Sequence, residues 1–99
     1  MAQSTIHVVA RLVARPETIE ALKLTLHELV TATRQEAGCG SYELLHNNHD
    51  PTDFVFVEEW SSDEALDAHL SSAHMQAASV KAGVLLSAPP DIRRYRLLY

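Results

Sequence analysis

The sequence has few of the features that mark secreted, membrane or nucleotide-binding proteins. It contains 1 cysteine, 3 glycines and 4 prolines among 99 residues. One cysteine excludes an intramolecular disulfide bond, and no Gly-x-Gly-x-x-Gly or phosphate-loop motif offers a seat for a nucleotide cofactor. The uninterrupted apolar stretches are only a few residues long, far short of a membrane span. We therefore expect that the chain neither spans a membrane nor binds a nucleotide cofactor.

The start of the chain, Met-Ala-Gln-Ser-Thr, lacks the basic and then apolar pattern of a secretory signal. A cytoplasmic location is the expectation. Basic residues are also scarce, because 8 lysines and arginines face 13 aspartates and glutamates, for a net charge of −5. Arg93, Arg94 and Arg96 alternate across a predicted strand and do not form one phosphate-binding face. Nucleic acid is therefore not an expected partner.

What is present is a globular pattern, with 46% hydrophobic and 21% charged residues. No linker or repeat divides the chain, so residues 1–99 are expected to form a single domain. The β-branched run Ile6 to Val13 predicts a strand. From Glu17 to Glu36, apolar residues recur at spacings of three and four, which predicts an amphipathic helix ended by Gly38.

The second half predicts two strands, a helical region and a final strand. The strands span Ser41 to His46 and Asp53 to Trp60. A helix should begin at Ser61, with Ser61 and Glu64 as a capping box. Ser71 and Ser72 should interrupt it before it ends near Leu86, and Ile92 to Leu98 should form the last strand. This β-α-β-β-α-β order is typical of an α+β, ferredoxin-like fold with a four-stranded antiparallel sheet.

Two helices cover only one face of such a sheet, yet the first and third strands are apolar on both faces. An uncovered face would leave a large apolar patch exposed to water. A second copy of the chain, packed sheet against sheet, solves this problem. The pattern therefore predicts a homodimer.

Three segments together resemble the antibiotic biosynthesis monooxygenase (ABM) family, most closely its small bacterial quinol monooxygenases. The first segment is Val8 to Arg11 with Arg15 and Pro16, and the second is Glu36 to Tyr42. The third holds Trp60, the Ser61 to Glu64 helix start, His69, His74 and Met75. The order and spacing of these motifs cover nearly the whole chain.

The resemblance implies a dimeric α+β barrel and oxidation of an aromatic substrate by dioxygen without a cofactor. Heme-degrading relatives use an Asn, a Trp and a His at positions that correspond here to Ala10, His69 and Ser79. All three differ, so no heme is expected. The Tyr and Asn of some antibiotic-tailoring members correspond to positions near Leu66 and Phe56, where they are missing.

His69 is the predicted catalytic residue, because an imidazole at the margin of a buried helix face could accept a phenolic proton. Trp60, Tyr42 and Phe56 are the predicted aromatic walls of a substrate pocket, and His74 is a second polar group for the substrate. Each of these residues also has a purely structural interpretation, as part of the core or as a solvated histidine.

A metal site is not expected. His69 and His74 are five residues apart, which turns them about 140° around a continuous helix and points them in different directions. His46 and His49 flank a turn beside Asp50, but no zinc-binding motif is present.

Three functions remain open. The first is a cofactor-independent monooxygenase acting on a hydroquinone or related phenol, with a small aromatic molecule and dioxygen as partners. The second is an acid–base enzyme that isomerises or degrades a small signal metabolite. The third is a dimer that binds aromatic molecules without catalysis.

Overall fold

The computed structural model describes residues 5–99. Residues 1–4, on which the expectation of no secretory signal largely depends, lie outside the described residues. The elements follow the order β-α-β-β-α-α-β. They are β1 (Ile6–Val13), a 3₁₀ turn (Pro16–Thr18), α1 (Ile19–Thr33), β2 (Cys39–His46), β3 (Asp53–Trp60), α2 (Asp63–Leu70), α3 (Ala73–Gly83) and β4 (Asp91–Tyr95).

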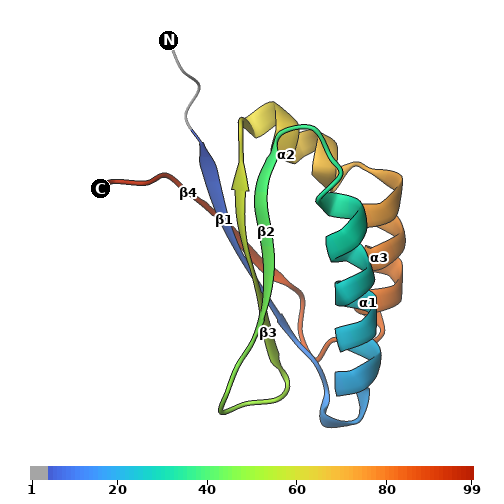
Figure 1. The fold of residues 1–99 in the computed structure, drawn as a ribbon. Coiled ribbons are helices and arrows are strands. Elements are labelled where there is room, and N and C mark those ends of the chain that lie inside the picture. Colours follow the sequence, from blue (N-terminus) through green and yellow to red (C-terminus); the bar gives the residue numbers. More distant parts are fainter. Residues whose placement is uncertain (1–4) are drawn as a thin grey trace.

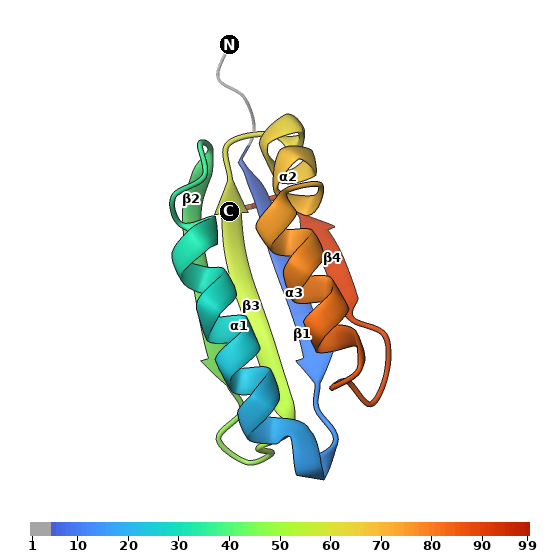
Figure 2. The same cartoon turned by 90° about the vertical axis from the view of Figure 1, so that its right-hand side faces the viewer.

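The four strands form one antiparallel sheet in the order β2-β3-β1-β4. The helices lie together on one face of this sheet, so the molecule has two layers (Figures 1 and 2). This arrangement confirms the predicted ferredoxin-like α+β fold. Strands β1 and β3 occupy the centre, where their inner side chains face the helices.

Side-chain alternation on β3 follows the prediction. Phe54, Phe56 and Trp60 point inward and are at most 2% exposed, whereas Val55 and Val57 face outward. The inner residues of β1 and the apolar stripe of α1 pack against them. Burial of this apolar surface supplies the main driving force for the fold.

Several helices and strands begin or end at other residues than predicted. Helix α1 ends at Thr33 and β4 ends at Tyr95, so both are shorter than expected. The predicted cap at Ser61 is wrong. Ser62 has extended backbone angles, and its Oγ accepts a hydrogen bond from the Ala65 amide at 3.1 Å, so Ser62 caps α2. None of the helices between residues 5 and 99 is both long enough and apolar enough to cross a membrane.

The predicted interruption of the helix at Ser71 and Ser72 is confirmed. The Ser72 hydroxyl donates a hydrogen bond to the His69 carbonyl at 2.7 Å and accepts one from the Met75 amide at 3.3 Å. One side chain therefore binds the end of α2 and caps the start of α3. This break changes the direction in which residues of α3 point.

The outer face of the sheet has no helix over it (Figure 1). Val9 pairs with Val57, and Leu45 pairs with Val55, so these residues share that face. Val9 is 38% exposed and Leu45 is 51% exposed. After β4 the chain extends away from the sheet on the side opposite the helices (Figure 1). A single chain thus leaves the second face uncovered.

Gly38 allows the chain to turn from α1 into β2. Its φ is +86°, and a Cβ placed there would lie 2.6 Å from Ala65 Cβ and 2.7 Å from Ser61 Oγ. Its carbonyl accepts a hydrogen bond from the Ser61 amide at 2.9 Å. Gly38 therefore serves this turn and the close approach of α2, and it is not the residue that ends α1.

Gly38→Ala should lower the free energy of unfolding by about 1–3 kcal/mol, because it strains the backbone and crowds α2. Gly83→Ala is the matched control, since nothing lies within 4 Å of a Cβ at that position and alanine favours a helix. Urea unfolding followed by circular dichroism measures both changes. Equal stability of the two variants would contradict the close packing at Gly38.

Candidate active site

A cavity of about 310 Å³ lies between the inner face of the sheet and the helices. Most of its lining is aliphatic or aromatic, from β1, β3, α1 and α3. The exceptions are few, and they include Glu58, His69 and Ser79. A largely apolar hollow with a small number of polar groups is typical of a site for a small ligand.

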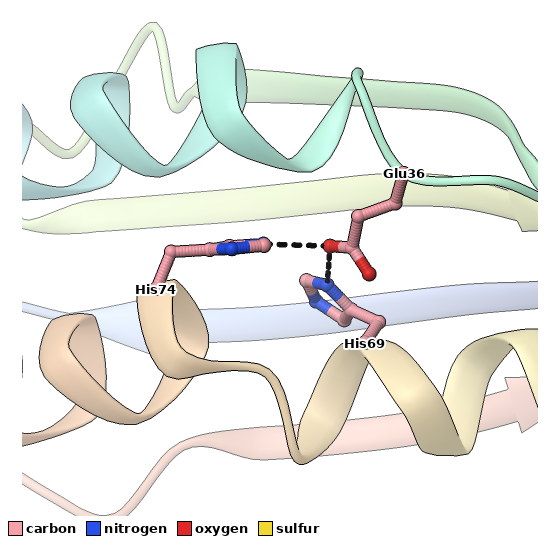
Figure 3. A group of neighbouring side chains, drawn as sticks. All are labelled: Glu36, His69 and His74. Atoms are coloured by element: carbon pink, nitrogen blue, oxygen red, sulfur yellow. Dashed lines mark hydrogen bonds and ion pairs between the residues drawn. The ribbon is translucent and has the colours of Figure 1, made fainter.

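His69 lies in the last turn of α2, lines this cavity and is only 2% exposed. Its Nδ1 is 2.7 Å from Oε2 of Glu36 (Figure 3). Since a carboxylate only accepts hydrogen bonds, this contact places a proton on Nδ1. The neutral ring then carries its lone pair on Nε2, which has no hydrogen-bond partner among residues 5–99. His69 is therefore arranged to accept a proton through Nε2.

His74 binds the same carboxylate oxygen from the other side (Figure 3). Its Nε2 is 2.7 Å from Glu36 Oε2. The side chains become more exposed along this series, from 2% for His69 to 15% for Glu36 and 32% for His74. His74 does not line the cavity. The Glu36, His69 and His74 cluster thus reaches from the cavity to the solvent.

The expectation that His69 and His74 point in different directions is wrong. It assumed one continuous helix through both residues. The break at Ser71 and Ser72 starts a new helix before His74, so its ring turns back toward Glu36.

The same cluster offers ligands for a metal ion. The donor atoms of Glu36, His69 and His74 all lie within 4.8 Å of one another. Two imidazoles and one carboxylate suit Zn²⁺ or Fe²⁺. The hydrogen bonds that both imidazoles make to Glu36 also account for this close grouping without a metal ion.

The predicted aromatic residues gather around His69. The Tyr42 ring centroid is 4.7 Å from that of Phe56 and 5.6 Å from that of His69. The Trp60 and His69 rings lie 4.7 Å apart with an interplanar angle of 31°. Tyr42 and Phe56 line the cavity, but Trp60 does not. Trp60 is 0% exposed and lies behind His69, where it supports the imidazole.

Glu58 is a site residue that the sequence interpretation missed. It lies on β3 between the inward-facing Phe56 and Trp60, lines the cavity and is 4% exposed. Its Oε1 accepts a 2.8 Å hydrogen bond from Trp60 Nε1. Burial raises the pKa of Glu58 to about 7, although the bond from Trp60 opposes this change. The sequence did contain a signal for this residue, because the alternation along β3 places Glu58 on the inward face, where a charged side chain is unusual.

Glu36 was also missed as a site residue, although it belongs to the Glu36 to Tyr42 motif. Its partners lie 33 and 38 residues further along the chain. No local spacing could have indicated these contacts.

Cys39 is half-buried beside this region, and burial raises the pKa of its thiol. It therefore carries little thiolate near neutral pH, so it is a poor nucleophile. Burial likewise raises the pKa of the Tyr42 hydroxyl, so Tyr42 stays neutral as a wall of the cavity.

Residues 5–81 match the model of the family described as "Antibiotic biosynthesis monooxygenase". The chain belongs to this family. Rv0793 of Mycobacterium tuberculosis is 37% identical over 86 residues, covering 87% of this chain and 84% of the relative. YcnE of Bacillus subtilis is 34% identical over 83 residues, covering 84% of this chain and 87% of that relative. The names of both relatives mark them as candidate monooxygenases.

Solved structures of similar proteins share the fold. The structure of Rv0793 has a TM-score of 0.91 at 33% identity and covers 97% of both chains. PA3566 from Pseudomonas aeruginosa has a TM-score of 0.93 at 31% identity, covering 100% of this chain and 99% of its own. The predicted family and fold are thereby confirmed.

Glu58 should make stability depend on pH. Burial raises its pKa from an ordinary 4.5 to about 7, so the folded state binds this proton more tightly than the unfolded state. The resulting stabilisation is fully present below about pH 4.5 and is lost as the pH rises through 7. It amounts to about 3 kcal/mol.

Glu58→Gln should remove this part of the pH dependence. Urea unfolding of both proteins at pH 5 and pH 8, at one protein concentration, measures the effect. Parallel stability changes in the two proteins would show that Glu58 titrates normally.

Proposed function

We propose that this ABM protein is a cofactor-independent monooxygenase that oxidises a hydroquinone or a related electron-rich phenol with dioxygen. The observation that carries the proposal is the lone pair of His69 Nε2, available at an apolar cavity while Nδ1 is held by Glu36. Family membership supports the monooxygenase role. The substrate class follows from the chemistry that such a base permits.

The reaction would begin when His69 Nε2 takes a phenolic proton. The positive imidazole that results is stabilised by the Glu36 carboxylate at 2.7 Å. The phenolate can then pass one electron to dioxygen, which avoids the spin barrier to direct reaction. The two radicals recombine, and the adduct collapses to a hydroxylated quinone and water. The protein supplies binding, proton transfer and exclusion of bulk water.

The aromatic residues have separate roles in this proposal. Tyr42 and Phe56 contact the substrate ring as walls of the cavity. Trp60 packs on the His69 ring and holds it in place. His74 reaches the substrate site only through Glu36, so its role is to share that carboxylate and connect it to solvent.

The functional unit is proposed to be a homodimer, joined through the outer face of the sheet. The apolar residues on that face are Val9, Leu45, Val55, Val57 and Tyr95. The segment after β4 extends away from the subunit and exposes further apolar side chains, with Leu98 75% exposed. A second copy would cover both surfaces.

Light scattering during size-exclusion chromatography should give twice the chain mass of 11.0 kDa. Val57→Asp places a charge at the centre of the outer face and should shift the mass toward one chain. Val80→Asp is the matched control, because Val80 is 77% exposed on α3, away from the sheet. A single-chain mass for the unaltered protein would rule out the dimer.

An acid–base isomerase is the second candidate, because two histidines sharing Glu36 could move protons without oxygen. Incubation with a hydroxyketone in D₂O without oxygen distinguishes the two functions. Exchange of the carbon-bound proton, followed by NMR, would favour the isomerase.

Chelator-treated protein should consume oxygen with a menadiol-type quinol faster than the quinol oxidises alone. His69→Ala should lower this rate by about 100-fold, the scale of a lost general base. His49→Ala is the control, because His49 is exposed in the turn between β2 and β3.

Three outcomes would contradict the proposal in different ways. If the protein consumed oxygen no faster than the quinol oxidises alone, it would have no oxygenase activity toward this quinol. Rescue of chelated protein by a divalent metal would make the Glu36, His69 and His74 cluster a metal site. If the unaltered protein and His69→Ala bound the quinol equally well and neither catalysed its oxidation, the protein would be a binding dimer.

A further inference from the structure

We propose that Glu58 is a second catalytic residue, the acid that donates a proton to the leaving oxygen when the O–O bond of the substrate peroxide breaks. The inference rests on the proposed function, since it concerns a later step of the same reaction. His69 acts on the phenol at the start, and Glu58 acts on the peroxide at the end.

The geometry separates the two oxygens of Glu58. Oε1 accepts the hydrogen bond from Trp60 Nε1 at 2.8 Å, which fixes the orientation of the carboxyl group. Oε2 has no hydrogen-bond partner among residues 5–99. Since Glu58 lines the cavity and is 4% exposed, the free oxygen is available to a ligand bound there.

The surroundings favour the protonated acid. The residues opposite Glu58 in the sheet are Val8 and Tyr42, and neither is a cation. No ion pair joins Glu58 to a lysine or arginine within the described part of the chain. An unpaired buried carboxyl group keeps its proton more readily, and the pKa of about 7 agrees with this. A neutral carboxyl group can donate through its O–H.

The chemistry requires such a donor. Menadiol and dioxygen must give a hydroxylated naphthoquinone and one water. His69 takes the phenolic proton, and the radical pair forms a carbon–peroxide bond at the unsubstituted ring carbon. The peroxide takes that proton back from His69, which is then free to remove the proton of the ring carbon. The electrons of the broken C–H bond form a new C=O bond and break the O–O bond. The distal oxygen leaves as hydroxide and takes the proton of Glu58 to become water, and both residues regain their starting protonation by exchange with solvent.

Without a donor near the peroxide, oxidation should divert to another outcome. The ring then gives two electrons and two protons to dioxygen, which yields the unhydroxylated quinone and hydrogen peroxide. The ratio of hydroxylated quinone to hydrogen peroxide therefore measures proton donation to the peroxide, independently of the overall rate.

A simpler structural role is that Glu58 only accepts the hydrogen bond of the buried Trp60. That role involves Oε1 and is kept by glutamine, whose amide oxygen also accepts. Glutamine cannot transfer a proton to the peroxide. Glu58→Gln thus separates the two roles.

The experiment supplies menadiol and ¹⁸O₂ to the full chain, and measures labelled hydroxyquinone and hydrogen peroxide. Glu58→Gln should lower the product ratio by about 100-fold, as expected for the loss of a general acid, while oxygen is still consumed. Glu58→Leu also lacks the acid and serves if the glutamine variant does not fold, although it removes the acceptor of the Trp60 hydrogen bond as well. Glu59→Gln is the control, with its side chain half-exposed on the other face of β3.

A wild-type product ratio in either folded Glu58 variant would overturn the role of Glu58 and leave the proposed function intact. Failure of the unaltered protein to form labelled hydroxyquinone would overturn the proposed function, and this inference with it. A reduced ratio in Glu59→Gln would show that the effect is not specific to Glu58.

Discussion

The hydrogen bond between His69 Nδ1 and Glu36 Oε2 is the interaction on which the site depends. It fixes the tautomer of a buried imidazole and leaves its other nitrogen at the cavity. It also joins the turn after α1 to α2, while His74 brings α3 to the same oxygen. The serine break between α2 and α3 makes this convergence possible, because it turns His74 back toward Glu36.

Two carboxyl groups near one cavity have different environments and therefore suit different tasks. Glu36 receives hydrogen bonds from two imidazoles and is partly exposed, which suits a carboxylate that stabilises positive charge. Glu58 is more deeply buried and has only the Trp60 indole as partner, which suits a neutral acid. When the environments of two carboxyl groups give them different pKa values, one can act as an acid while the other stays ionised.

Much of the fold could be predicted because it follows local patterns. The bounds of β3 match the alternation of Phe54, Phe56 and Trp60, and the serine pair marks the helix break. The site was less predictable because its contacts are long-range. Helix phase alone placed His74 away from His69, and no local pattern could bring Glu36 to both. Trp60 was expected as a wall of the pocket, but its inward position on β3 buries it behind His69.

A crystal structure with a bound hydroxynaphthoquinone tests the central claim most directly, which is that the cavity holds an aromatic ring within reach of the His69 base. The account predicts the ring in the cavity against Tyr42 and Phe56, with one ligand oxygen about 3 Å from His69 Nε2. A ligand bound elsewhere, or an imidazole whose Nε2 points away from the cavity, would contradict the account.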